Sequence, residues 1–133
     1  MNTETRVPVS RDADIVTARQ LGRELAAKAG FAGSDLTLIA TAISEVARNI
    51  ISYAELGEIR LDLATRGARR GLQVVAQDQG PGIRDLDEAM RDGFSTGKSL
   101  GLGLPGARRL MDDFEIVSDL GKGTTVTMRK WLR

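Results

Sequence analysis

The sequence predicts a single α+β domain, a two-layer α/β sandwich in which helices cover one face of a mixed, mainly antiparallel β-sheet. Its 133 residues are enough for one domain of ordinary size, so we treat residues 1–133 as one unit. Hydrophobic residues make up 41% and charged residues 28%, which is typical of a chain that buries a core. Strand-like segments occur mostly in neighbouring pairs, with helical segments before and between the pairs, and this grouping favours the α+β class.

The first part of the chain is predicted to be a short strand followed by two long helices. Residues 5–10 alternate in the manner of a strand, and Ser10 or Asp12 can cap a helix that ends at Gly30. A second helix over residues 34–54 has one apolar side, which should face the core. That side consists of Leu36, Ile39, Ala40, Ile43, Ala47, Ile50 and Ala54.

The second part is predicted to contain two hairpins with helices and a glycine-rich loop between them. The turn-forming stretch ATRGARRG joins the two strands of the first hairpin, and GKG joins the two strands of the second. The expected elements are strands 57–63 and 72–78, a helix at 85–91, a loop at 93–106, a helix at 104–111, and strands 114–119 and 124–131.

Composition excludes several kinds of chemistry. The chain has no Cys and no His, which removes disulfides, thiolate nucleophiles, imidazole metal ligands and His-based triads. With 19 basic and 18 acidic residues the net charge is +1, which disfavours nucleic acid as a partner. We expect neither a signal peptide nor a membrane helix, because no apolar stretch is long enough, and we therefore expect a cytoplasmic protein.

Glu45 and Asn49 are the first candidate site residues. They are four apart in the predicted second helix, so they lie on one side of it, opposite the apolar side. Such a pair usually belongs to a solvated outer face. This helix, however, has only three charged residues, and a face so poor in charge is more often covered. We therefore expect Glu45 to line a pocket and Asn49 to be an oxygen ligand suited to Mg²⁺.

Asp78 is the second candidate. Period-two alternation in its strand directs the carboxylate toward the core layer, where an ionised group requires a partner. The following glycines, Gly80 and Gly82, would allow a planar ligand to approach closely. An equally good interpretation is that Asp78 only organises its own turn.

The loop at 93–106 contains two motifs that fail as phosphate-binding signatures on their own. GFSTGKS lacks the first glycine of a Walker loop, and GLGLPG has no strand immediately before it. What remains is that Gly101 and Gly103 free backbone NH groups for an anion at the start of a helix. Lys98, Arg108 and Arg109 are nearby candidates for phosphate charge, although surface basic residues are usually only solvated.

Taken in order, ISEVARNI, DQGPGI, GLGLPG and GTT resemble the motif series of the Bergerat-fold (GHKL) ATPases, the superfamily of gyrase, Hsp90, histidine kinases and MutL. Together with ARQLG, DGFST, RRLMD and the final KWLR, they resemble the small RsbT-type serine kinases over nearly the whole chain. The resemblance implies ATP and Mg²⁺ as cofactors. It implies the following roles: Glu45 as the catalytic carboxylate, Asn49 as the Mg²⁺ ligand, Asp78 as the adenine acceptor, Gly80 and Gly82 as the turn beside adenine, Gly101 and Gly103 as the phosphate lid, and Thr125 as support for the adenine site.

The same resemblance implies partners. Such kinases phosphorylate serine or threonine on STAS-domain proteins of a stressosome, and the freed kinase activates a PP2C-type phosphatase by partner switching. Two alternatives stay open from the sequence. One is an anti-sigma factor with serine kinase activity, and the other is a non-catalytic binding module gated by nucleotide.

Overall fold

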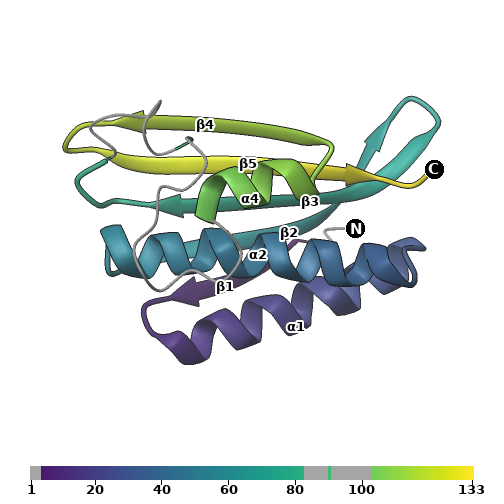
Figure 1. Ribbon diagram of the computed structural model, residues 1–133, viewed down its shortest axis with the longest axis horizontal. Helices are drawn as coiled ribbons and strands as arrows, with labels where there is room; N and C mark the ends of the chain where they lie inside the picture. Colours follow the sequence, from purple (N-terminus) through teal and green to yellow (C-terminus); the bar gives the residue numbers. More distant parts are fainter. Residues whose placement is uncertain (1–3, 83–89, 91–102) are drawn as a thin grey trace.

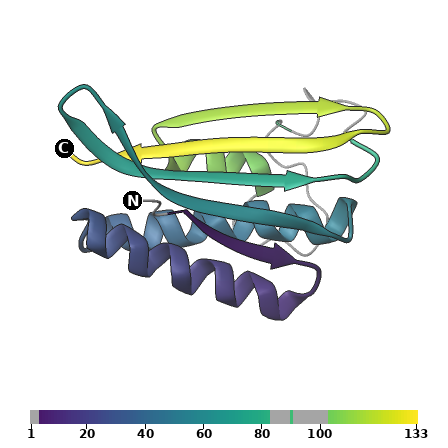
Figure 2. The same ribbon diagram turned by 180° about the vertical axis from the view of Figure 1, so that it is seen from behind.

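The computed structural model describes residues 4–82, 90 and 103–133, and these form two layers. Five strands make one sheet in the order β1-β2-β3-β5-β4, and the helices lie side by side on one of its faces (Figure 1). Figure 2 shows the opposite face of the sheet, over which none of the described helices lies. The elements are β1 (Thr5–Val9), α1 (Asp12–Ala29), α2 (Ser34–Tyr53), β2 (Gly57–Arg66), β3 (Arg69–Asp78), α4 (Gly103–Leu110), β4 (Asp113–Asp119) and β5 (Gly123–Trp131).

The predicted fold class is confirmed, and the sheet is more regular than expected. Every pairing among the described strands is antiparallel, whereas the sequence left a mixed sheet open. The first hairpin is also longer than the expected strands 57–63 and 72–78, because its ladder continues to the pair Arg66 and Arg69 around a turn at Gly67. The added residues are mostly exposed, so no burial pattern in the sequence announces them.

The core lies between the sheet and α2. The apolar residues of one parity in β2, β3 and β5 face the helices, as period-two alternation requires. Each such side chain stabilises the fold by about 1.5–3 kcal/mol when fully buried. The largest side chains buried to below 2% exposure include Ile39, Ile43, Val46, Ile50, Ile59, Leu61, Leu72, Val74 and Met128.

Helix α2 is buried on more than its predicted apolar side. Ala42, Ser44, Glu45 and Val46 are buried as well, because α1 packs on one flank of α2 and α4 on the other. The low charge of this helix therefore did indicate a covered face. Within residues 4–82, 90 and 103–133, none of the helices has both the length and the apolar character to cross a membrane.

The helix expected at 104–111 is α4. The helix expected at 85–91 lies outside the described residues except for Met90, and most of the loop expected at 93–106 lies outside them too.

The start of α1 differs from the expected cap. Neither Ser10 nor Asp12 caps it; the helix begins after Arg11, and the cap is made by Asp14 in the first turn. Its Oδ2 accepts hydrogen bonds from the backbone NH of Ser10 at 2.9 Å and of Arg11 at 3.2 Å. These bonds satisfy donors that have no partner within the helix and place a negative charge at its positive end.

The cap predicts a pH-dependent contribution to stability. The hydrogen bond from the Ser10 backbone is the main cause that lowers the pKa of Asp14. A carboxyl whose pKa is lower in the folded state stabilises the fold above its unfolded pKa, about 3.9, and loses that effect as the pH falls through the folded value. We expect Asp14→Asn to lower the thermal midpoint at pH 7, with a difference from the wild type that shrinks toward zero below about pH 4.

Differential scanning calorimetry across pH 2–8 would measure this. Glu24→Gln is the control, because it makes the same charge change on an exposed position in the middle of α1. A deficit of Asp14→Asn that is as large in acid as at neutral pH would show that the carboxylate charge is not what stabilises the cap.

Candidate functional site

Glu45 lies on α2, and its side chain is 3% exposed. A buried carboxylate is costly unless it is paired. Arg48, three residues later on the same helix, places Nη1 3.4 Å from Glu45 Oε2 and is itself 23% exposed. Arg48 is one of the three charged residues of this helix, and no role is predicted for it from the sequence. The i, i+3 spacing of Glu45 and Arg48 could have predicted this ion pair, because residues three apart on a helix are neighbours.

Asn49 lies one turn after Glu45 on α2 and is half-buried. Its side-chain amide makes no hydrogen bond with any residue that the structure describes, so its oxygen is available to a ligand. The described residues also contain no group of three or more acidic side chains that could hold a metal ion by themselves. A single amide oxygen suits Mg²⁺, which commonly takes one or two protein ligands and completes its shell with water and substrate phosphates.

Asp78 ends β3 and is 6% exposed, with its side chain in the core layer as the alternation predicted. Oδ1 accepts hydrogen bonds from the backbone NH of Gly80 at 2.9 Å and of Thr124 at 3.2 Å. Among the described residues, none donates a hydrogen bond to Oδ2. In the part of the chain that the structure describes, no side-chain N or O atom is both buried and unpaired, so Oδ2 is accessible. Asp78 therefore organises its own turn with Oδ1, while Oδ2 has no donor among the described residues.

The glycines after Asp78 allow this turn to lie close to other segments of the chain. A Cβ on Gly80 would lie 2.5 Å from Ala54 Cβ, at the end of α2. Gly82 has φ 81°, and a Cβ there would lie 2.5 Å from the carbonyl oxygen of Asp119. From the sequence, both glycines are expected to allow the approach of a planar ligand. In the fold they also let the turn pack between α2 and the β4–β5 hairpin.

Thr125 is not the threonine beside Asp78. It has the parity of the face that points away from the helices, and it pairs in register with Gln77 and Val117. Thr124 has the parity of the buried Val126; its backbone NH reaches Asp78, and its hydroxyl lies 2.8 Å from that of Ser118. The structure thus brings Thr124 to this end of the site. The alternation along β5 could have distinguished the two.

Of the two glycines predicted for the phosphate lid, the structure describes one. Gly103 is the first residue of α4 and has φ 68°, whereas Gly101 and Lys98 lie outside the described residues. Leu104 and the next three residues are buried where α4 packs on α2. Arg108 and Arg109 are exposed. The start of α4 is therefore fixed next to the helix that holds Glu45 and Asn49.

The chain was compared with known proteins. Residues 9–130 match the histidine kinase-like ATPase domain. The chain belongs to this family. It is 49% identical over 133 residues to the serine/threonine-protein kinase RsbT of Bacillus subtilis (strain 168), and the match covers 100% of both chains.

More distant relatives of this histidine kinase-like ATPase domain are anti-sigma factors. The anti-sigma F factor of Thermoanaerobacter sp. (strain X514) is 33% identical over 100 residues, which cover 71% of this chain and 68% of that protein. That of Clostridium kluyveri (strain NBRC 12016) is 29% identical over 102 residues, which cover 72% of this chain and 70% of that protein. The predicted family, fold class and enzyme class are confirmed: the chain is an ATP-using kinase of the RsbT type.

Proposed function

We propose that this kinase transfers the γ-phosphoryl group of Mg·ATP to serine or threonine on a STAS-domain stressosome protein in the cytoplasm. Once released from that scaffold, it would bind and activate a PP2C-type phosphatase. The observation that best supports the nucleotide site is Asp78, whose Oδ1 is held by two backbone NH groups while Oδ2 is kept for a donor. The amino group of adenine is such a donor. Full-length similarity to a serine/threonine-protein kinase supports the acceptor class.

Each site residue has a separate role in this proposal. Asp78 accepts the adenine amino group, in a turn that Gly80 and Gly82 allow to pack tightly. Gly101 and Gly103, which the resemblance assigns to the lid, offer backbone NH groups to the phosphates. Thr124, rather than Thr125, supports the adenine end through its bond to Asp78. Mg²⁺, held by Asn49, would neutralise phosphate charge when ATP is bound.

Glu45 is the proposed catalytic residue. Its carboxylate would accept the proton of the substrate hydroxyl as the oxygen forms its bond to the γ-phosphorus and the bond to the ADP oxygen breaks. Arg48 neutralises the buried carboxylate and fixes its orientation. The acceptor of the phosphoryl group in this proposal is the partner's serine or threonine, which must reach the buried carboxylate.

Incubation with γ-labelled ATP and a purified STAS-domain protein tests the function, since label should appear on a serine or threonine of that protein. Isothermal titration tests the metal role: Asn49→Ala should weaken Mg²⁺-dependent ATP binding about tenfold, equivalent to about 1.4 kcal/mol. Thr37→Ala is the matched control, since Thr37 is an exposed polar residue on α2. Wild-type affinity of Asn49→Ala in the presence of Mg²⁺ would contradict the assignment.

Similarity to the anti-sigma F factors favours one second candidate. The chain would then hold a sigma factor and phosphorylate its antagonist with the same site. Co-purification with a sigma factor in the presence of ATP would support this function, and co-purification with a PP2C-type phosphatase alone would support the first.

A further inference from the structure

The sheet face that points away from the helices contains a cavity at the end nearest to the α2–β2 connection. Figure 2 shows this face. The side chains of Arg6, Glu58 and Arg60 belong to it, because they have the opposite parity to the core residues Ile59 and Leu61. The volume is about 500 Å³, and the lining residues are Arg6, Ala54, Leu56, Gly57, Glu58, Arg60, Gln77 and Gln79. The kinase mechanism uses none of these side chains.

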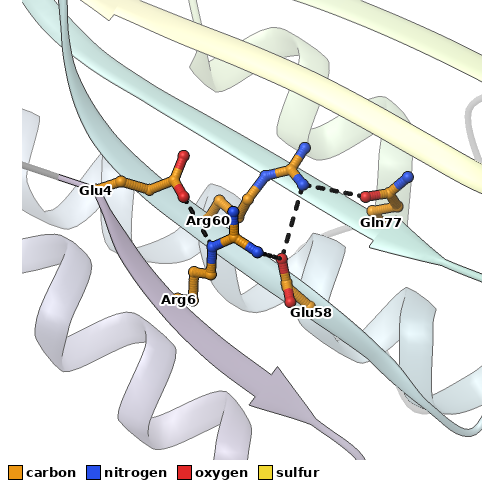
Figure 3. Close-up of polar contacts among 5 residues, drawn as sticks. All are labelled: Glu4, Arg6, Glu58, Arg60 and Gln77. Atoms are coloured by element: carbon orange, nitrogen blue, oxygen red, sulfur yellow. Dashed lines mark hydrogen bonds and ion pairs between the residues drawn. The ribbon is translucent and has the colours of Figure 1, made fainter. Parts of the chain in front are cut away.

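Two arginines stand directly opposite each other in this cavity. Arg6 on β1 and Arg60 on β2 are register partners, and like charges in that position destabilise an antiparallel pair. Figure 3 shows the groups that offset this repulsion: Glu4 and Glu58 beside Arg6, and Gln77 beside Arg60. The two arginines therefore depend on these neighbours for charge balance.

Glu58 is the carboxylate that both arginines share, and its contacts with them are long. A single oxygen, Oε1 of Glu58, lies 3.5 Å from Arg6 Nη1 and 3.7 Å from Arg60 Nη1 (Figure 3). The Glu58 and Arg6 side chains are 35% and 61% exposed, so these contacts contribute little to stability. A carboxylate from outside could replace Glu58 and make closer, two-pronged contacts with the guanidinium groups.

Apolar side chains lie beside the charged cavity. Glu55 has φ 68°, a conformation that non-glycine residues rarely adopt, and it is followed by Leu56, which is 64% exposed. Val117 is 63% exposed on the same sheet face, and Thr125 of β5 lies between it and Gln77 of the cavity. A partner that fits this surface therefore presents apolar groups next to its acid, as a protein segment does and an inorganic anion does not.

We propose that this cavity is a docking site for an acidic, apolar segment of a protein partner. A carboxylate of the partner takes the place of Glu58 between Arg6 and Arg60, and a neighbouring apolar side chain packs on Leu56. A polyanion such as nucleic acid fits less well, because one carboxylate can take the place of Glu58, whereas a row of phosphates would also face Glu4. This docking site is separate from the catalytic residues on α2.

A peptide titration tests the proposal on the full ¹⁵N-labelled chain. The probe is acetyl-Leu-Glu-Leu-Glu-amide, and the matched probe has glutamine in place of glutamate. We expect the glutamate peptide to shift the amide signals of Arg6, Leu56 and Arg60, and to bind at least tenfold more tightly than the glutamine peptide. Arg60→Gln should weaken its binding at least tenfold. Arg129→Gln should leave it within twofold, since Arg129 is on the same face but bonds to Gln73 on β3.

Equal binding of the two peptides, or no shifts at millimolar peptide, would overturn the proposal. Shifts that grow with protein concentration alone would also overturn it, because they would indicate a second copy on this face. Urea unfolding tests whether Arg60 has a purely structural role. If the arginine pair serves a ligand, we expect Arg60→Gln to keep or raise the urea midpoint of unfolding. A lower midpoint would show that Arg60 is needed for the sheet. ATP affinity should stay unchanged, which separates this result from a failure of the kinase site.

Discussion

Glu45→Gln is expected to lower the rate of phosphotransfer by about 10²- to 10⁴-fold, the usual contribution of a general base. Glutamine keeps the size of the side chain but cannot accept the proton of a serine hydroxyl. Glu45 is buried, and in the variant Arg48 would face a neutral partner. ATP affinity should change less than threefold, because the proposed adenine and metal contacts are made by other residues. Single-turnover transfer from labelled ATP, with ATP affinity from titration, measures both quantities.

Asp35→Asn is the matched control for this change. Asp35 is the other carboxylate of α2, in its first turn, and its neutralisation should leave transfer within twofold of the wild type. Transfer by Glu45→Gln at the wild-type rate would remove Glu45 from the mechanism. Loss of ATP binding in proportion to transfer would instead give Glu45 a role in holding the nucleotide.

The fold class and the burial of Glu45 and Asp78 could be predicted from the sequence because those features depend on local patterns. Helical spacing gave the core side of α2, and its low charge indicated that Glu45 is covered. Period-two alternation gave the burial of Asp78. These signals are strong because a buried face tolerates few residue types.

The features that sequence analysis missed depend on tertiary contacts. The ladder at the end of the first hairpin is exposed, so no alternation marks it. Gly80 is required by Ala54, which is distant in sequence and lies against it only in the folded chain. One partner of Asp78 is the backbone NH of Thr124. Every residue except proline provides such a group, so alternation along β5 could indicate that Thr124 faces the core but not that it bonds to Asp78.

The second large effect concerns recognition of the adenine ring of ATP. Asp78→Asn keeps an acceptor for the backbone NH groups of Gly80 and Thr124 but places an NH₂ donor where Oδ2 was. An NH₂ group cannot accept from the adenine amino group. Loss of a hydrogen bond to a charged acceptor costs about 1.5–3 kcal/mol. We therefore expect ATP to bind about 10- to 100-fold more weakly.

Inosine triphosphate separates recognition of the base from damage to the fold. It differs from ATP in having an oxygen in place of the adenine amino group, so it offers an acceptor where ATP offers a donor. The wild type should prefer ATP, because Asp78 has only acceptors to present. Asp78→Asn should bring the two affinities together or reverse their order, since its NH₂ group can donate to that oxygen. Asp119→Asn, at the exposed end of β4, is the control and should keep the preference for ATP. An Asp78→Asn protein that binds both nucleotides more weakly by one common factor would show that the carboxylate supports the turn and does not read the base.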